Sequence, residues 1–490
     1  MTPNYAELLR AFLPEAALTL GALLVLGYDL VLGRKHSDDR RLRTAVLLGL
    51  IGIVAAGFAS FKAGVDGAAF GGVVVLDSLG FVTRFGVLLL AALSLAMVTS
   101  LSRLRHPAEY VAVMLIATAG FTLMAVAQQL LIAFLALELA SLSLYVLTGF
   151  DKTRPESAEA GLKYFLFGGI SAAFLLFGFS LIYGLTGSIE LPVIAKQLSG
   201  MPADPLLIVA LVMILVAFGF KAAAAPFHLW APDVYQGAPA PSAALIASAS
   251  KLAGFTLFGR MLWVGFAPAA GDALSSELTR PGWLTVLVVI SAVSLVLGNL
   301  AALAQSNLRR LLAYSAIAHA GALLLGVIIG GDVGPSPLFY YAATYGLATV
   351  GIFGVIAVAE RTGPCHNLTD LVGLSRRSPL LAGCLLVFVL SLAGIPPLAG
   401  FFGKFIVFTY ALKAQGLGGP AGWLALLAIA MSAVSLYYYL LILKQALVVR
   451  PSAESSPLVV PLGAAAGLGF AAAMILALGL FPSVVLRMIN

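Results

Sequence analysis

Residues 219–233 read GFKAAAAPFHLWAPD and decide the fold class, because they place a lysine and a proline inside an apolar run. The run that leads into them is long enough to span a bilayer as a helix. Proline removes a helical hydrogen bond, and non-helical backbone at membrane depth is tolerated only where protein buries it or where it lines a wet cavity. We therefore predict a membrane helix broken near Pro226, with Lys221 beside a backbone gap that water can enter. The alternative interpretation is a structural kink for packing.

The composition of the whole chain agrees with a membrane protein. Of its 490 residues, 61% are hydrophobic and only 10% are charged, against about 25% charged in soluble globular proteins. The basic residues stand in short clusters between apolar runs, so the sequence does not form the basic face of a nucleic-acid-binding protein. Two cysteines are too few for a disulfide framework, and no dinucleotide fingerprint or cysteine cluster for iron–sulfur binding occurs.

Long apolar runs predict an all-α polytopic membrane protein with about 14 transmembrane helices. The first run is long enough to remain as a helix and does not read as a cleaved signal peptide. The expected spans lie near 9–32, 44–62, 74–101, 109–127, 129–150, 159–185, 206–226, 238–265, 283–305, 309–330, 336–360, 379–410, 421–447 and 457–480. The segments 187–205 and 266–282 read as interfacial loops, and GAAFGG (67–72) reads as a turn.

The distribution of lysine and arginine predicts the orientation. Loops that follow odd-numbered spans contain 16 of these residues, and the other side contains 7. Cytoplasmic loops are the ones enriched in Lys and Arg. Both termini are therefore expected on the non-cytoplasmic side.

Five cations lie inside predicted spans, namely Arg84, Lys163, Lys221, Lys251 and Lys404, and the carboxylate Glu138 joins the four lysines. Ionisable groups within a membrane are costly and usually functional. Snorkelling of the lysines to the interface is the alternative, and it suits Lys163 best because that residue lies near a helix end. For Glu138 the alternative is a structural hydrogen bond or ion pair.

In a buried Lys–Glu pair, burial favours the neutral forms and the opposite charge favours the charged forms. Movement of either partner can therefore shift a proton. Histidine suits the same task because its ordinary pKa is near neutral. His319 lies in mid-span, and His228 lies just beyond Pro226. We predict a relay role for His319 and treat His228 as a further candidate. The alternative for either residue is a satisfied, hydrogen-bonded core histidine.

A second interrupted span, SLAGIPPLAGFFGKF (391–405), lies five helices after the first and also contains a lysine. Interrupted helices at corresponding places in two halves point to inverted repeats with a site at the breaks. We predict two inverted five-helix repeats, helices 4–8 and 9–13, with helices 7 and 12 broken. The corresponding domains are 1–108 for helices 1–3, 109–265 and 283–447 for the repeats, and 457–490 for the last helix.

These motifs resemble the antiporter-like membrane subunits of respiratory complex I, the proton-pumping NADH:quinone oxidoreductase. The resemblance rests on segments that together cover most of the chain: 13–30 (LPEAALTLGALLVLGYDL), 136–147 (ALELASLSLYVL), 163–178 (KYFLFGGISAAFLLFG), 228–239 (HLWAPDVYQGAP), 305–321 (QSNLRRLLAYSAIAHAG) and 391–405. Among such subunits the N-type is the most similar. The LPE opening, EAGLKYF (159–165) and a lysine at position 404 support that choice.

The resemblance implies a role for each residue. Glu138 and Lys221 would form the ion pair of a first half-channel, and Lys163 would modulate that pair. Lys251 would be the bridging lysine, His319 would extend the central hydrophilic axis, and Lys404 would be the exit lysine of the second half-channel. Quinone reduction elsewhere in the complex would drive proton translocation. NADH, flavin, iron–sulfur clusters and quinone would be handled by other subunits, so this chain would hold no cofactor or metal.

The resemblance also implies an inner-membrane location in a bacterium and neighbours in the complex. The expected partners are M-type antiporter-like and small K-, J- and A-type membrane subunits, together with the lipid bilayer. Two alternatives stay open from the residues. One is a subunit of an Mrp-type cation/proton antiporter or of a membrane hydrogenase, and the other is a structural anchor whose buried charges only hold helices together.

Overall fold

The structure is a computed structural model that describes residues 5–65, 67–101, 104–199, 201, 204–271, 282–450 and 457–489. Within these residues, 13 helices are long and apolar enough to cross a membrane. The broken pair α17 (Pro379–Ala393) and α18 (Ala399–Gln415) supplies the remaining predicted span. The one sheet in the described residues is a short antiparallel hairpin of β1 (Gly67–Ala69) and β2 (Val74–Leu76). The prediction of an all-α polytopic membrane protein is confirmed.

The other long helices follow one another with short connections. They are α2 (Leu13–Val31), α3 (Asp38–Ala63), α4 (Ser78–Met97), α5 (Pro107–Met124), α6 (Leu130–Thr148), α7 (Pro155–Thr186), α9 (Pro205–Ala222), α11 (Ala240–Ala247) with α12 (Ala249–Arg260), α13 (Trp283–Leu303), α14 (Leu308–Val333), α15 (Ser336–Ala359), α19 (Pro420–Leu443) and α20 (Leu462–Leu480). Shorter helices are α1 (Tyr5–Ala11), α8 (Leu191–Leu198), α10 (Trp230–Gly237), α16 (Leu374–Arg377) and α21 (Ser483–Ile489). Single 3₁₀ or π turns lie at Gly33–Lys35, Val98–Ser100, Met261–Gly265, Ala267–Ala269, Leu368–Leu371 and Lys444–Val448.

Local sequence explains where many of these helices begin. Proline occupies the first turn of α5, α7, α9, α17 and α19, where its missing N–H has no intrahelical partner to lose. Asp77 and Asn307 accept hydrogen bonds from the first-turn amides of α4 and α14. These caps satisfy amides that the helix itself leaves unpaired.

Two segments predicted to lack regular structure contain some. Part of GAAFGG forms β1, which pairs with β2, so the third span begins at Ser78 and not near residue 74. The segment 187–205 contains α8, whose buried residues Leu191, Ile194 and Leu198 repeat at helical spacing. A helix of eight residues is too short to span, and it was missed because the length criterion selects only spanning helices.

Several predicted spans have different ends. The first helix is divided at Phe12 into α1 and α2, and the eighth is interrupted at Ser248, between α11 and α12. The seventh ends at Ala222, four residues before the proline, because Ala223 adopts a left-handed backbone conformation with φ of 57°. The fourth and fifth helices, divided only by a Gln pair, are separate as predicted.

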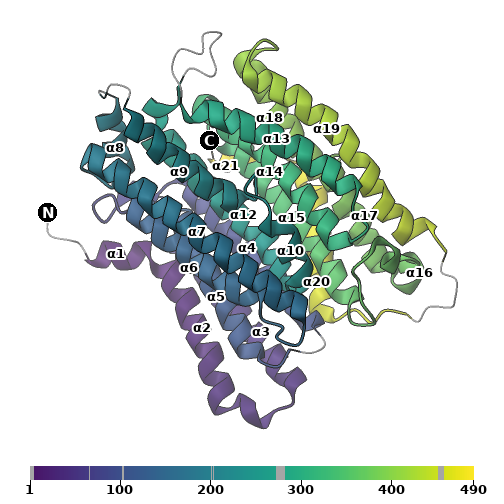
Figure 1. Cartoon of the computed structure of the whole chain (residues 1–490). Coiled ribbons are helices and arrows are strands. Elements are labelled where there is room, and N and C mark those ends of the chain that lie inside the picture. The colour runs from purple at the N-terminus through teal and green to yellow at the C-terminus, as the bar shows by residue number, and fades with distance from the viewer. Residues whose placement is uncertain are drawn as a thin grey trace.

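The core lies around the middle helices of the chain. Figure 1 shows α12, α14 and α15 in the interior, with α2 and α3 at one side and α19 at the other. The share of buried residues within an apolar 18-residue stretch differs from helix to helix. This share is 100% for Ala240–Gly265 and 94% for α14 and α15, whereas it is 28% for α2. Helices that are apolar all round and enclosed by protein form a core, so any ionisable group on them is shielded from lipid and from bulk water.

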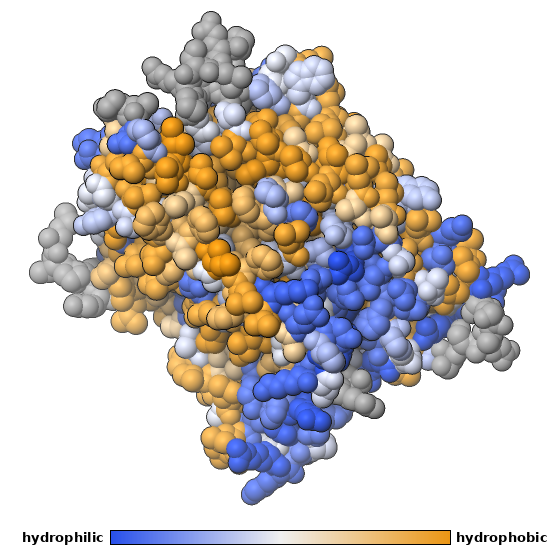
Figure 2. Space-filling model, viewed as in Figure 1, coloured by the Kyte–Doolittle hydropathy of each residue, from blue (hydrophilic) through white to orange (hydrophobic). Residues whose placement is uncertain are grey.

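The outer surface has the distribution expected of a membrane protein. Figure 2 shows an apolar surface over α7, α9 and α13, with hydrophilic residues gathered towards the ends of the helices near α10 and α16. Many large apolar side chains are exposed on these outer helices, such as Leu162, Phe165 and Val212. An apolar surface of this extent is costly in water and suits contact with lipid tails.

Candidate functional site

The first break lies between α9 and α10 and follows from the backbone at residues 223–229. After the left-handed Ala223, the Ala225 amide bonds to Ser294 Oγ of α13 at 2.9 Å. The indole of Trp230 donates to the carbonyl of Phe220, in the last turn of α9, at 3.0 Å. Protein groups thus replace helical hydrogen bonds, as non-helical backbone within a membrane requires.

The second break lies between α17 and α18. Gly394 ends α17 with φ of 85°, a conformation that glycine adopts without strain. A side chain at this position would approach Lys404 Cδ to 3.2 Å, so glycine also leaves space for the lysine stem. Gly400 N–H bonds to Ser391 Oγ at 3.1 Å across the break. Both predicted broken helices are therefore present.

Lys221 and Lys251 share a small cavity at the first break. Their exposed fractions are 6% and 3%. Lys221 Nζ donates to Ser141 Oγ at 3.1 Å, and Lys251 Nζ donates to the Ala316 carbonyl at 2.5 Å and lies 5.3 Å from the centre of the Tyr345 ring. The cavity that both lysines line measures about 10 Å³, which is room for about one water molecule.

His319 lies at the centre of the buried helix α14 between two tyrosine hydroxyls. Its Nδ1 is 2.8 Å from Tyr341 Oη, and its Nε2 is 3.1 Å from Tyr439 Oη. The Tyr439 hydroxyl also bonds to Ser315. Tyr345, which lies beneath the Lys251 ammonium, places its ring 4.8 Å from the imidazole. His319 is also within electrostatic range of both Lys251 and Lys404.

Lys404 lies at the second break and completes a buried series of four residues: Lys221, Lys251, His319 and Lys404. It is 8% exposed, and its Nζ donates to the Ala393 carbonyl, the last residue of α17, at 3.3 Å. A cavity of about 20 Å³ is lined by Lys404, His319, Tyr341, Asn299 and Tyr438. The structure thus brings together Lys221, Lys251, His319 and Lys404, which are separated by as much as 183 positions in the sequence.

Among the described residues, no carboxylate forms a salt bridge with Lys221, Lys251 or Lys404. Glu138 is half-buried on α6, three residues before Ser141, and it interacts electrostatically with Lys221 without direct contact. The direct ion pair implied for Glu138 and Lys221 is absent from this arrangement. Ser141 occupies the hydrogen-bonding position next to the Lys221 ammonium.

Lys163 lies apart from the buried series. Its side chain is 39% exposed and contacts Glu159 at 2.6 Å and Asp233 at 2.7 Å. Asp233 also accepts a bond of 2.6 Å from Arg310. Lys163 on α7 and Arg310 on α14 are therefore joined through one carboxylate on α10. Sequence reasoning missed Asp233, although it ends the motif around Lys221.

His228 lies in the first break, as expected from its position after Pro226. It is 7% exposed, and its Nδ1 has no hydrogen-bond partner among the described residues. Its ring lies 6.5 Å from that of Tyr314. The structure therefore places it near the series without joining it to His319 by a direct contact.

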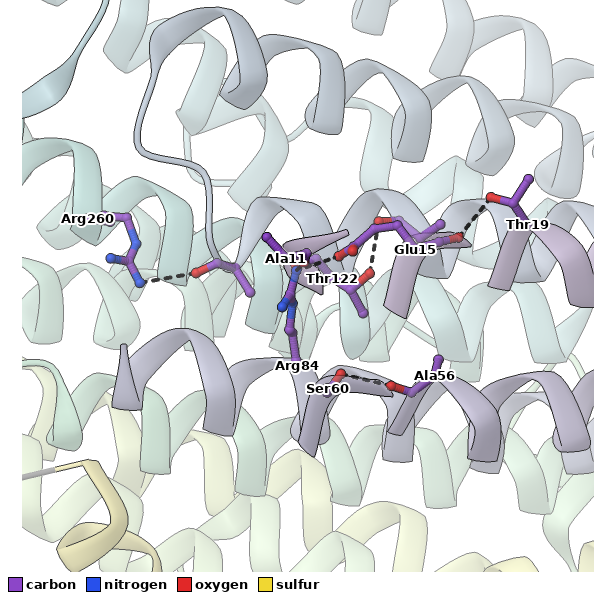
Figure 3. A network of polar contacts seen from close by, with 10 residues as sticks. Ala11, Glu15, Thr19, Ala56, Ser60, Arg84, Thr122 and Arg260 are labelled. Carbon is purple, nitrogen blue, oxygen red and sulfur yellow. Dashed lines mark hydrogen bonds and ion pairs between the residues drawn. The ribbon is translucent and has the colours of Figure 1, made fainter. Parts of the chain in front are cut away.

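A second set of buried charges was not predicted as a pair. Arg84 on α4 donates to Glu15 Oε1 on α2 at 2.9 Å and to the Ala11 carbonyl at 3.0 Å. Figure 3 shows the guanidinium between Ala11, Glu15 and Thr122. The arginine was visible in the sequence as a cation within a span, but its partner lies 69 residues away.

Two further buried arginines have carboxylate partners. Arg260 bonds to Asp77 at 2.7 Å and 2.9 Å, and Arg309 bonds to Glu360. Arg260 lies in the last turn of α12, within the predicted span 238–265, and its side chain is 4% exposed. No group of three or more metal-ligating side chains occurs among the residues that the structure describes.

The sequence can now be compared with known proteins. A family model described as NADH:quinone oxidoreductase/Mrp antiporter, transmembrane, matches residues 127–435. This segment contains both breaks and every residue of the buried series. The chain belongs to this antiporter family. Its family relatives include NADH-quinone oxidoreductase subunit N 2 of Acidobacterium capsulatum, which is 48% identical over 99% of both chains.

Solved structures of the family have the same fold. A chain of respiratory complex I from Thermus thermophilus is 36% identical, has a TM-score of 0.79, and aligns over 97% of this chain and 98% of its own. A chain of the Mrp complex from Dietzia is 24% identical with a TM-score of 0.79, over 97% and 96% of the two chains. The second likeness concerns the fold alone. The resemblance to N-type antiporter-like subunits, inferred from sequence motifs, is therefore confirmed.

Proposed function

We propose that this chain is a proton-translocating membrane subunit of an NADH:quinone oxidoreductase. Its full-length relatives carry the name of subunit N of that enzyme. The chain contributes to a translocase reaction without a redox centre of its own. Quinone reduction elsewhere in the complex supplies the energy, and NADH, flavin and iron–sulfur clusters belong to other subunits.

One observation carries the proposal: three buried lysines and a histidine lie in series, and no carboxylate in the described part of the chain contacts them directly. A lysine can lose its proton, so each ammonium in this series can become a neutral amine without leaving a partner carboxylate stranded. Neutral hydroxyl and carbonyl oxygens hold Lys221, Lys251 and Lys404. Space for about one water occurs at each end of the series. These features suit proton transfer between neighbouring groups.

The division of labour follows the two breaks. Glu138, Lys221 and Lys163 serve a first half-channel in residues 109–265, and Lys404 serves a second in 283–447, with helices 1–3 and the last helix outside the two inverted repeats. Lys251 and His319 join the halves. Lys163 modulates Lys221 indirectly, through Asp233 and the helix α10 that follows the break. His228 contributes at the first break.

The proposed location is a bacterial inner membrane, with both termini on the non-cytoplasmic side. The predominance of Lys and Arg after odd-numbered spans supports this orientation. The proposed partners are other membrane subunits of the complex, M-type and small K-, J- and A-type.

The test is proton translocation by the assembled complex in closed membrane vesicles. Lys221→Met and Glu138→Gln should both lower the number of protons moved per NADH oxidised, while the complex still assembles. Asp332→Asn, at an exposed end of α14, serves as the matched charge-removal control. Full translocation in both test variants would remove the basis of the proposal.

The rival function is that of an Mrp-type cation/proton antiporter subunit, which the shared fold leaves open. The two functions differ in whether proton movement depends on NADH oxidation or on sodium. Translocation driven by NADH oxidation in sodium-free medium supports the oxidoreductase subunit. Proton movement that requires sodium and proceeds without NADH supports the antiporter.

A further inference from the structure

The two tyrosine partners of His319 give that residue an unusual freedom. In a neutral imidazole one nitrogen donates a hydrogen bond and the other accepts one. A tyrosine hydroxyl can do either, so the same positions of Tyr341, His319 and Tyr439 satisfy both tautomers. A carbonyl or carboxylate partner would instead accept only, and would fix the proton on the nitrogen that it contacts.

The hydroxyl chain extends towards a lysine on each side. Tyr439 bonds to Ser315, which precedes Ala316, the residue whose carbonyl accepts from Lys251. On the other side Tyr341 lines the cavity that also contains Lys404. The exposed fraction of Tyr341 is 1% and that of Tyr439 is 0%, so bulk water does not compete for either hydroxyl.

We propose that the hydroxyls of Tyr341 and Tyr439 engage both nitrogens of His319 and make it a tautomer-exchange site between Lys251 and Lys404. This inference rests on the proposed function and adds two residues to it. The tyrosines hold the ring with both nitrogens engaged, and the position of one proton on the ring is the variable. Exchange of tautomers then moves one proton across the imidazole without movement of a helix.

The transfer balances along the whole chain. Lys251 changes from ammonium to amine as it releases one proton. Ser315, Tyr439, His319 and Tyr341 each take up one proton and release one, and the cavity of about 20 Å³ that Tyr341 and Lys404 both line has room for a bridging water. Lys404 changes from amine to ammonium. The reverse direction uses the same groups, and reorientation of the hydroxyls resets the chain for the next proton.

The experiment replaces single hydroxyls in the assembled complex. Tyr439→Phe and Tyr341→Phe should each slow proton translocation about fivefold, the factor expected from loss of one ordinary hydrogen bond. Tyr340→Phe is the matched control, because this neighbouring tyrosine of α15 bonds to the Leu478 carbonyl and not to His319. Blue-native gels measure assembly in each variant, and Ser315→Ala replaces Tyr439→Phe if that variant fails to assemble.

A double variant separates positioning of His319 from a general structural role. If Tyr439 acts through His319, Tyr439→Phe should add nothing to the defect of His319→Gln. An additive defect, or wild-type translocation in both tyrosine variants while His319→Gln is impaired, would overturn the tautomer proposal and leave the proposed function intact. Wild-type translocation in His319→Gln itself would overturn the role of His319 in both.

Discussion

Two kinds of buried cation occur in this protein, and their surroundings differ. The buried arginines Arg84, Arg260 and Arg309 each contact a carboxylate, with side-chain exposures of 2%, 4% and 0%. Among the described residues, the ammonium groups of Lys221, Lys251 and Lys404 donate to hydroxyl and carbonyl oxygens and have no carboxylate partner. The guanidinium keeps its proton under all ordinary conditions and therefore needs a compensating charge when buried, whereas an amine can be neutral.

The difference in partners distinguishes the arginines, which stabilise the fold, from the lysines, which suit proton transfer. Arg84 joins α2, α4 and α5 through Glu15 and the Thr122 carbonyl, and its neutralised pair has no reason to change. The lysine series is held by weaker, neutral partners that fit either protonation state. Among the four lysines proposed for the proton relay, Lys163 differs from the other three because it has two carboxylate partners.

The largest expected effect is on an arginine pair. Arg84→Met would leave Glu15 buried without its cation, which costs about 3–5 kcal/mol in buried pairs. We expect the variant to accumulate poorly, as measured by size-exclusion chromatography of detergent extracts. Arg84→Met with Glu15→Leu removes both charges and should restore accumulation. Equal yields of the single variant and the wild type would show that this pair does not stabilise the fold.

The second prediction is the opposite outcome for a lysine of the series. Lys404→Met strands no carboxylate, so stability should stay within about 1 kcal/mol of wild type. Proton translocation should fall about 100-fold or more, because a positioned proton-transfer group contributes about 10²–10⁴-fold. Vesicle acidification and thermal unfolding measure the two quantities on one preparation. Unfolding at much lower temperature would mean that Lys404 is a structural residue like Arg84.

Lys404→Arg sharpens the same comparison. The substitution keeps the positive charge but removes the ability to release a proton. We expect translocation as poor as in Lys404→Met, together with lower stability because a permanent charge would then be buried without a carboxylate. The corresponding Arg84→Lys variant should assemble, since Glu15 remains available. Normal pumping by Lys404→Arg would contradict a role in proton transfer.

A smaller effect is expected at the carboxylate that joins Lys163 and Arg310. Asp233→Asn removes a partly exposed ion-pair partner, and such pairs contribute about 0.2–1 kcal/mol each. Loss of the two pairs, about 0.4–2 kcal/mol together, should slow coupled turnover by about two- to thirtyfold. The matched control is Glu159→Gln, which removes only the Lys163 contact on its own helix. The proposal that Asp233 couples Lys163 to α10 fails if both variants behave alike.

The smallest effect concerns a thiol beside the Arg309–Glu360 pair. Burial, and then the charge of Glu360, raise the pKa of Cys365 to about 12. The thiol stays protonated below this value, and the thiolate is the reactive form, so maleimide should label Cys365 very slowly from pH 7 to pH 9. Glu360→Gln should speed labelling of Cys365 because it weakens the contact with Arg309 and exposes the thiol. Mass spectrometry measures the rate of labelling. Rapid labelling of the unaltered protein would show that the thiol is exposed already.

The sequence predicted the spans and the in-span charges because both are local properties. Lys221, Lys251 and Lys404 stood out as cations within apolar runs, and Pro226 and the 396–397 proline pair predicted the two breaks. The short helix α8 and the strands β1 and β2 were missed because a length criterion for spanning helices does not detect them. The exact ends of α9 and α11 depended on the local backbone at Ala223 and Ser248.

What the sequence by itself determined is therefore an all-helical membrane protein with two broken helices and several costly charges. Only the tertiary structure decided which group accompanies each charge. Lys221 meets Ser141 from 80 residues away, Lys251 meets Ala316 from 65, and His319 meets Tyr439 from 120. The physical reason is that a helix apolar on every side carries no signal of which face meets which neighbour, so partners in a buried core are fixed only by how the helices pack.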